Sequence, residues 1–134
     1  MEISTRGRYA VRVLCDIAKQ SDSYVSIADL AKSQEISVKY LEHIISKLVK
    51  AKILVSMRGA NGGYRLQKSP KEYTVLEILQ ATDDKIQLAT CSTQNCPRQE
   101  KCLSKPLWDA LSEVIIDFLA KTTLQDVIDK DLKK

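Results

Sequence analysis

Apolar residues recur with a helical period through most of the chain. In residues 5–20, one face of a predicted helix is formed by Tyr9, Val13, Leu14 and Ile17. Residues 26–34 and 37–51 share this period, and the second segment carries the most regular stripe, Leu41, Ile44, Ile45, Leu48 and Val49. Two helices joined by a tight turn, the second longer than the first, are typical of a helix-turn-helix.

The period changes after residue 52. Residues 53–59 and 64–68 are expected to form two short strands, with a turn at Asn61-Gly62, because both residue types tolerate a positive φ. A helix-turn-helix followed by such a hairpin is a winged helix. The sequence therefore predicts a mainly α fold with a small β-hairpin wing.

Three further helices are expected after the wing. One runs through 74–82, a long one follows Pro106 through residue 121, and a short one follows Thr123. N-caps are expected at Ser26, Ser37, Thr74 and Thr123. The predicted division is a DNA-binding unit at 1–82, a cysteine-containing loop at 83–103, and a dimerisation helix with a short last helix at 104–134.

The long predicted helix carries a wide apolar stripe. Its members are Leu107, Trp108, Leu111, Val114, Ile115, Phe118 and Leu119. This stripe is wider than one neighbouring helix needs, so it forms either a dimer interface or intramolecular core. DNA-binding proteins of this size usually act as two-fold dimers, which favours the interface.

Charge is unevenly distributed over the 134 residues. Residues 1–70 contain 12 Lys and Arg against 6 Asp and Glu, a net charge of +6, whereas residues 71–134 contain 9 against 11, a net charge of −2. A basic front half indicates a polyanionic partner such as DNA, although solvated helix faces also collect lysine.

No run of apolar residues is long enough to span a bilayer, and the first residues lack the apolar region of a secretory signal. We therefore expect a cytoplasmic protein without a membrane partner. Thiols stay reduced in that compartment, so clustered cysteines there are more often metal ligands or redox groups than disulfides.

The predicted second helix of the helix-turn-helix is suited to the major groove of double-stranded DNA. Its leading turn presents Ser37, Lys39 and Tyr40, and its outer face presents Glu42, His43 and Lys47. Glu42 can accept a hydrogen bond from a cytosine amino group, whereas a lysine mostly meets phosphates. The plainer alternatives are a solvated basic helix and a surface histidine.

The predicted wing adds Arg58, which is a candidate minor-groove probe, and Asn61 and Gly62, which allow the backbone to approach DNA closely. These positions complete the expected DNA-binding surface.

Three of the four cysteines, Cys91, Cys96 and Cys102, lie within twelve residues in the spacing C-x4-C-x5-C. Structural zinc sites need four ligands and usually use shorter gaps, and no fourth Cys or His lies nearby. An iron–sulfur cluster with three cysteines and one unusual ligand fits better. Three unconnected surface cysteines are the plainer alternative, and Cys15 is expected to be a buried structural thiol.

The sequence resembles the IscR/NsrR/CymR-type winged helix-turn-helix transcriptional regulators, and it is most similar to the iron–sulfur regulators among them. The resemblance rests on "STRGRYAV", "ISVKYLEHIISKL", "RGANGGYRL", "CLSKPLWDAL" and "TTLQDVI", in this order. It implies a homodimer with crossed long helices on a pseudo-palindromic operator. It also implies that Cys91, Cys96 and Cys102 are ligands of a 2Fe–2S cluster.

The chain departs from this pattern at the fourth cluster ligand. The position of the histidine in IscR-like proteins is Lys105, and the position of the aspartate in NsrR-like proteins is Arg8. Glu2, Glu100, another carboxylate, a residue of a second subunit, or an exogenous thiol or water remain as candidates. The CymR-like relatives lack the cluster cysteines, so that subgroup fits less well.

The sequence thus predicts a transcriptional regulator, a repressor by preference, whose operator affinity is set by an iron–sulfur cluster. The alternative is a cluster-free repressor that responds to thiol redox state or a metal ion, for example in sulfur metabolism. An enzyme is not expected, because the single histidine lies on the presumed recognition helix and no catalytic set or phosphate-binding loop is evident.

Overall fold

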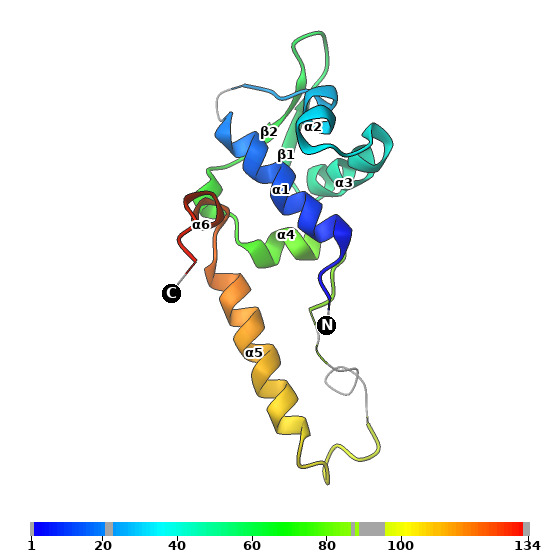
Figure 1. Cartoon of the computed structure of the whole chain (residues 1–134), viewed down its shortest axis with the longest axis vertical. Coiled ribbons are helices and arrows are strands. Elements are labelled where there is room, and N and C mark those ends of the chain that lie inside the picture. Colours follow the sequence, from blue (N-terminus) through cyan, green and yellow to red (C-terminus); the bar gives the residue numbers. More distant parts are fainter. Residues whose placement is uncertain (1, 21–22, 87, 89–95, 133–134) are drawn as a thin grey trace.

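The computed structural model describes residues 2–20, 23–86, 88 and 96–132. The elements are α1 (Thr5–Lys19), α2 (Ile27–Gln34), α3 (Val38–Lys50), β1 (Leu54–Met57), β2 (Gly63–Leu66), the 3-10 turn η1 (Pro70–Glu72), α4 (Val75–Ala81), α5 (Lys105–Lys121) and α6 (Leu124–Asp129). The predicted winged helix-turn-helix with a long C-terminal helix is confirmed. The wing, α2 and α3 lie at one end of the molecule, and α5 extends away from them (Figure 1).

The helices begin at the expected caps. The side chain of Ser37 accepts a hydrogen bond from the Tyr40 amide at 3.2 Å, and Ser26, Thr74 and Thr123 make the equivalent bonds. Helix α2 ends at Gln34, and its C-cap Glu35 has a left-handed φ of 55°. This left-handed residue produces the tight turn between the two helices of the helix-turn-helix.

The core forms around α1. Its Val13 and Leu14 are fully buried, and so are Leu41, Ile44 and Leu48 of α3. Burying one such side chain stabilises the fold by about 1.5–3 kcal/mol relative to leaving it exposed. The apolar stripe predicted for α3 therefore packs against the core, and the opposite, polar face of α3 points to solvent.

The wing is an antiparallel hairpin in which Met57 pairs with Gly63 and Leu54 with Leu66. An isolated bridge joins it to the segment before α2, because Val25 and Tyr64 exchange two backbone hydrogen bonds of 2.9 Å. The wing is thus fastened directly to the helix-turn-helix.

The turn occurs where Asn61-Gly62 predicted it, but the expected positive φ at these two residues is wrong. The left-handed residues are Gly59, at φ 114°, and Gly63, at φ 150°. The loop has five residues rather than the expected four, and its turn is closed by the 3.0 Å bond from the Gly62 amide to the Gly59 carbonyl. Gly62 is needed for space, since a Cβ there would lie 2.1 Å from the Met57 carbonyl oxygen.

Replacing Gly63 with alanine should lower the free energy of unfolding by about 1–3 kcal/mol, because the left-handed backbone is strained for alanine. The new Cβ would also lie 2.3 Å from the Val25 carbonyl oxygen. Urea unfolding measures the loss. Gly59→Ala is the matched control, since its φ is also positive but nothing lies within 4 Å of its Cβ. Equal losses for the two variants would contradict the steric part of this account.

Backbone hydrogen bonds join the segment between α5 and α6 to the residues at the start of α4. The Val75 amide donates to the Thr122 carbonyl at 2.8 Å, and the Leu124 amide donates to the Tyr73 carbonyl at 2.9 Å. Leu124 is fully buried, so α6 packs into the main body. No helix in the described part of the chain is long and apolar enough to cross a membrane.

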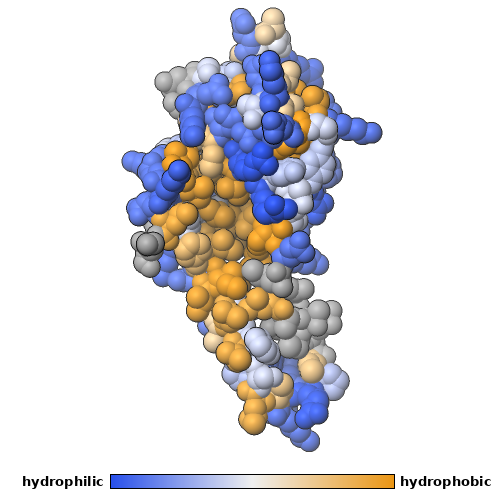
Figure 2. Space-filling view, in the orientation of Figure 1, coloured by the Kyte–Doolittle hydropathy of each residue, from blue (hydrophilic) through white to orange (hydrophobic). Residues whose placement is uncertain are grey.

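Helix α5 has no buried residue. Four apolar residues spaced 4, 3 and 4 positions apart form what we call the α5 stripe: Leu107, Leu111, Val114 and Phe118, which are 57%, 41%, 65% and 46% exposed. Figure 2 shows hydrophobic residues gathered over the junction of α5 with the main body and continuing along α5. Much of the predicted apolar stripe is therefore uncovered in a single chain.

Candidate DNA-binding surface and cysteine segment

Helix α3 presents a continuous polar face to solvent. Lys39, Glu42, His43 and Ser46 are all exposed on it. The Ser46 hydroxyl donates to the backbone carbonyl of His43 at 2.8 Å, and this bond does not involve the His43 side chain. The structure thus brings these predicted contact residues onto one side of the second helix of the helix-turn-helix.

Ser37 and Tyr40 lie at the N-terminal end of this face. The Ser37 oxygen is used to cap α3, and its hydroxyl proton remains able to donate to a phosphate. The Tyr40 ring is partly buried and meets the Tyr9 ring edge-on at 5.9 Å between centroids. This packing fixes the leading turn of α3 against α1, so that Tyr40 positions the helix as well as presenting a polar tip.

Lys47 differs from the other predicted contacts because it has an ionic partner. Its Nζ pairs with the Asp83 carboxylate, and the two side chains are 24% and 63% exposed. The pKa of Asp83 lies below its ordinary value, first because of this hydrogen bond and then because of the positive charges of Lys47, Arg6 and Lys50. Asp83 was not predicted as a functional residue, and a separation of 36 residues gives no local signal for the pair.

The predicted wing residues Arg58 and Asn61 are exposed in the five-residue loop, with Gly62 beside them. Arg65 lies on β2, where its guanidinium stacks over the Tyr24 ring at 4.9 Å. The exposed Arg58 is therefore the charged side chain at the tip of the wing.

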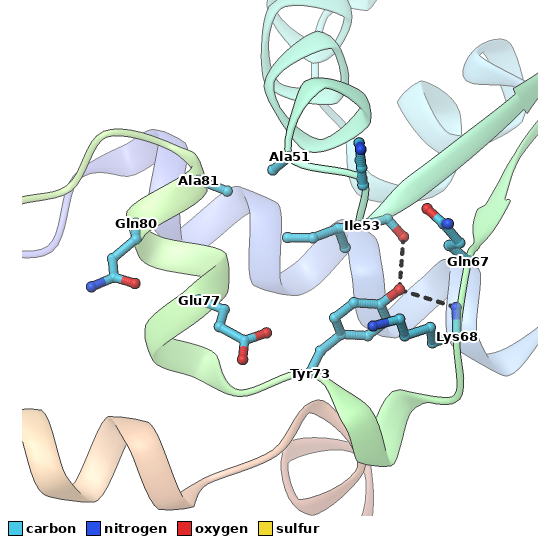
Figure 3. Close-up of a pocket in the computed structure, with 9 residues that line it drawn as sticks. Ala51, Ile53, Gln67, Lys68, Tyr73, Glu77, Gln80 and Ala81 are labelled. Atoms are coloured by element: carbon cyan, nitrogen blue, oxygen red, sulfur yellow. Dashed lines mark hydrogen bonds between the residues drawn. The ribbon is translucent and has the colours of Figure 1, made fainter.

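A cavity of about 550 Å³ lies under the root of the wing. It is lined by Ala51, Lys52, Ile53, Gln67, Lys68, Tyr73, Glu77, Gln80 and Ala81. The Tyr73 hydroxyl accepts from the Lys68 amide at 3.0 Å and donates to the Ile53 carbonyl at 3.4 Å (Figure 3). Tyr73 therefore clamps both strands of the wing at the point where the chain leaves α3, and its burial raises the pKa of its hydroxyl.

Of the predicted cluster ligands, Cys96 and Cys102 are described and partly exposed, whereas Cys91 lies outside the described residues. The Cys102 sulfur lies 3.2 Å from the Ser104 hydroxyl. Its pKa is below the ordinary thiol value, because of this hydrogen bond first and then those from the Ser104 and Lys105 backbone amides. This environment favours the thiolate, which is the form that binds metal ions, so the donor chemistry of Cys102 fits a cluster.

The positions considered for a fourth ligand have other partners or lie exposed. Lys105 forms a 2.5 Å ion pair with Asp109 on α5, and Arg8 donates to the Thr5 hydroxyl at 3.1 Å. Glu2 and Glu100 are exposed. Within the described residues, no three Cys, His, Asp or Glu side chains are grouped for a metal ion.

Cys15 faces the core of the DNA-binding unit. It is half-buried on α1 and packs against the core cluster, and burial raises the pKa of its thiol. This environment agrees with the structural role that the sequence predicted for it.

Comparison with known proteins finds relatives over almost the whole chain. The chain is 37% identical over 130 residues to the HTH-type transcriptional regulator IscR of Pectobacterium carotovorum, covering 96% of this chain and 79% of that protein. Among solved structures, CymR of B. subtilis superposes with a TM-score of 0.85 at 28% identity, covering 97% of this chain and 98% of that one. IscR of T. potens gives 0.76 at 28% identity, covering 98% and 88%.

Residues 3–130 match the Rrf2 family, which is described as an iron-dependent transcriptional regulator family. This match spans the helix-turn-helix, the wing, the cysteine segment and α5 together. The chain therefore belongs to the Rrf2 family of DNA-binding transcriptional regulators and is not an enzyme.

Proposed function

We propose that this chain is a homodimeric repressor whose operator affinity is set by a 2Fe–2S cluster bound to Cys91, Cys96 and Cys102. The observation that carries the proposal is the contact of Cys102 with Ser104, the N-cap of α5. It joins the cysteine segment to the helix with the uncovered apolar face. Further support is the similarity to IscR proteins and the description of the family as iron-dependent.

The α5 stripe supports the proposed dimer contact. Its 4-3-4 spacing places all four side chains on one side of the helix, as in helices that pair along an apolar seam. Large uncovered apolar faces are uncommon on monomers and mark interaction sites. A second copy of the same helix offers the same stripe and closes the contact by two-fold symmetry.

When bound, a 2Fe–2S cluster supplies one centre that fixes several thiolates relative to one another. In this chain, Cys102 transmits that constraint to the first turn of α5 through Ser104. A shift of α5 against its copy then changes the separation of the two α3 helices. Half-sites lie roughly 34 Å apart, so a small change of separation alters operator affinity.

The direct test is operator selection from a random duplex library with anaerobically prepared protein, repeated after removal of metal. We expect a pseudo-palindromic sequence whose affinity differs between the two preparations. Recovery of no preferred sequence by either preparation would contradict the proposal.

Removing the Glu42 side chain should change sequence preference more than affinity. An accepted bond from a cytosine amino group contributes about 1–3 kcal/mol of discrimination, so Glu42→Ala should reduce discrimination at one base pair roughly tenfold. Selection on duplexes randomised at each position measures this effect. Asp131→Ala, which removes an exposed charge after α6, is the control and should keep the wild-type preference. An unchanged preference in Glu42→Ala would argue against α3 in the groove.

A second candidate is a cluster-free repressor that senses thiol oxidation. It is supported by the lowered pKa of Cys102, which makes that thiol reactive, and by likeness to CymR proteins. B. subtilis CymR is described as a global cysteine regulator, and a solved structure of S. aureus CymR is of an oxidized form. Mass spectrometry of mildly oxidised protein, compared with anaerobic protein, distinguishes a thiol sensor from a cluster protein.

A further inference from the structure

Asp83 lies among cations of the DNA-binding unit. Its carboxylate pairs with Lys47 of α3, and the charges of Arg6 and Lys50 also lower its pKa. Lys47, Lys50, Ala51, Ala81 and Asp83 line one shallow pocket at the C-terminal end of α3. A negatively charged group thus occupies a basic site on the helix that is proposed to enter DNA.

We propose that the Asp83 carboxylate occupies a phosphodiester-binding site made by Lys47 and Lys50, and must leave Lys47 when a DNA phosphate binds there. This inference rests on the proposed placement of α3 in the major groove. A carboxylate and a phosphate accept the same charge-assisted hydrogen bond from a lysine ammonium group. Asp83 is therefore an intramolecular competitor of the DNA backbone.

The ion pair is weak enough to be exchanged. Asp83 is 63% exposed, and pairs this open to solvent contribute little to stability. Exchange for a phosphate keeps Lys47 paired and also releases counterions from the DNA. The pair thus lowers DNA affinity without preventing binding.

Asp83 is also the point at which α4 passes into the cysteine segment. It has a φ of 65°, and its neighbour Thr82 is fully buried with its hydroxyl bonded to the Leu79 carbonyl at 3.0 Å. The Asp84 amide donates to the same carbonyl at 3.0 Å. These bonds fix the backbone of Asp83 so that its side chain reaches α3.

The following residue, Asp84, packs against α1. Asp84 Oδ2 is buried against Gly7 of α1, where a Cβ would lie only 2.0 Å away. It has no hydrogen-bond partner among the described residues, and an unsatisfied buried oxygen is unfavourable.

The test is the affinity of Asp83→Asn for an operator and for a random-sequence duplex of equal length, at low and physiological salt. We expect about a threefold gain on both duplexes, within the range measured for exposed ion pairs, and a smaller gain at higher salt. The gain should be equal on the two duplexes because phosphate contacts carry no sequence information. Asp131→Asn is the control, because it makes the same charge change after α6. Its DNA affinity should not rise by a comparable factor.

The same substitution in a Lys47→Ala protein tests whether Lys47 is the cation for which Asp83 and the phosphate compete. In Lys47→Ala protein, Asp83→Asn should gain no more than the Asp131→Asn control. A full gain without Lys47 would show general repulsion of DNA and would overturn the competition. Wild-type affinity in Asp83→Asn would also overturn it, whereas failure of wild-type protein to bind any duplex would instead refute the proposed function.

Discussion

Leu111→Glu should convert the protein to a monomer that keeps its fold and loses operator affinity. Leu111 lies in the middle of the α5 stripe and is 41% exposed in the single chain, so a charge there leaves the core intact. In a dimer the same charge would be buried against apolar side chains without a partner, which is strongly unfavourable. Two linked recognition helices bind about 10²–10⁴ times more tightly than one, and this factor is the expected loss.

Sedimentation velocity and operator titration measure the two effects, and circular dichroism confirms the fold. Ala120→Glu is the matched control, because it adds the same charge to an exposed position of α5 away from the stripe. It should remain dimeric. A dimeric Leu111→Glu protein would show that the α5 stripe does not form the dimer contact.

Cys96→Ser and Cys102→Ser should each abolish bound iron and inorganic sulfide. The proposed site has only three cysteine ligands, so loss of one leaves too few thiolates to retain a labile centre. Anaerobically purified wild-type protein should be coloured and should contain iron and sulfide in equal amounts, as a 2Fe–2S cluster requires. Absorption spectroscopy with iron, sulfide and zinc analysis measures this directly.

Cys15→Ser is the control for these variants. Cys15 packs against the core on α1, and its burial raises its thiol pKa, so its replacement should leave iron and sulfide unchanged. Colourless wild-type protein that contains stoichiometric zinc and no sulfide would rule out the cluster. The second candidate would then remain, with the same cysteines acting as thiols.

The sequence predicted most of the fold because its signals are local. The stripe through Leu41, Ile44 and Leu48 identified the buried face of α3, and all three residues are fully buried. Ser37 and Thr123 indicated where helices begin, because each caps its helix by accepting a hydrogen bond from the amide three residues later. The same pattern also identified the exposed face of α3, which carries Glu42 and His43, because that face lies opposite the buried stripe.

Features that depend on distant contacts were missed. The pairing of Lys47 with Asp83 requires α3 and the end of α4 to meet in three dimensions, and neither residue is unusual in its own segment. The pair Asn61-Gly62 located the turn, but the sequence did not indicate that the left-handed residues would be Gly59 and Gly63. The fourth cluster ligand could not be predicted, because the positions of the ligand in IscR-like and NsrR-like proteins are occupied here by Lys105 and Arg8.

The bridge between Val25 and Tyr64 joins the wing to the helix-turn-helix. Tyr73 adds a second clamp at the other end of the hairpin. In the proposed dimer, a change that enters through α5 would therefore move the two DNA-binding units apart or together without altering how each unit contacts its half-site. We expect such a dimer to distinguish operators by the number of base pairs between their half-sites.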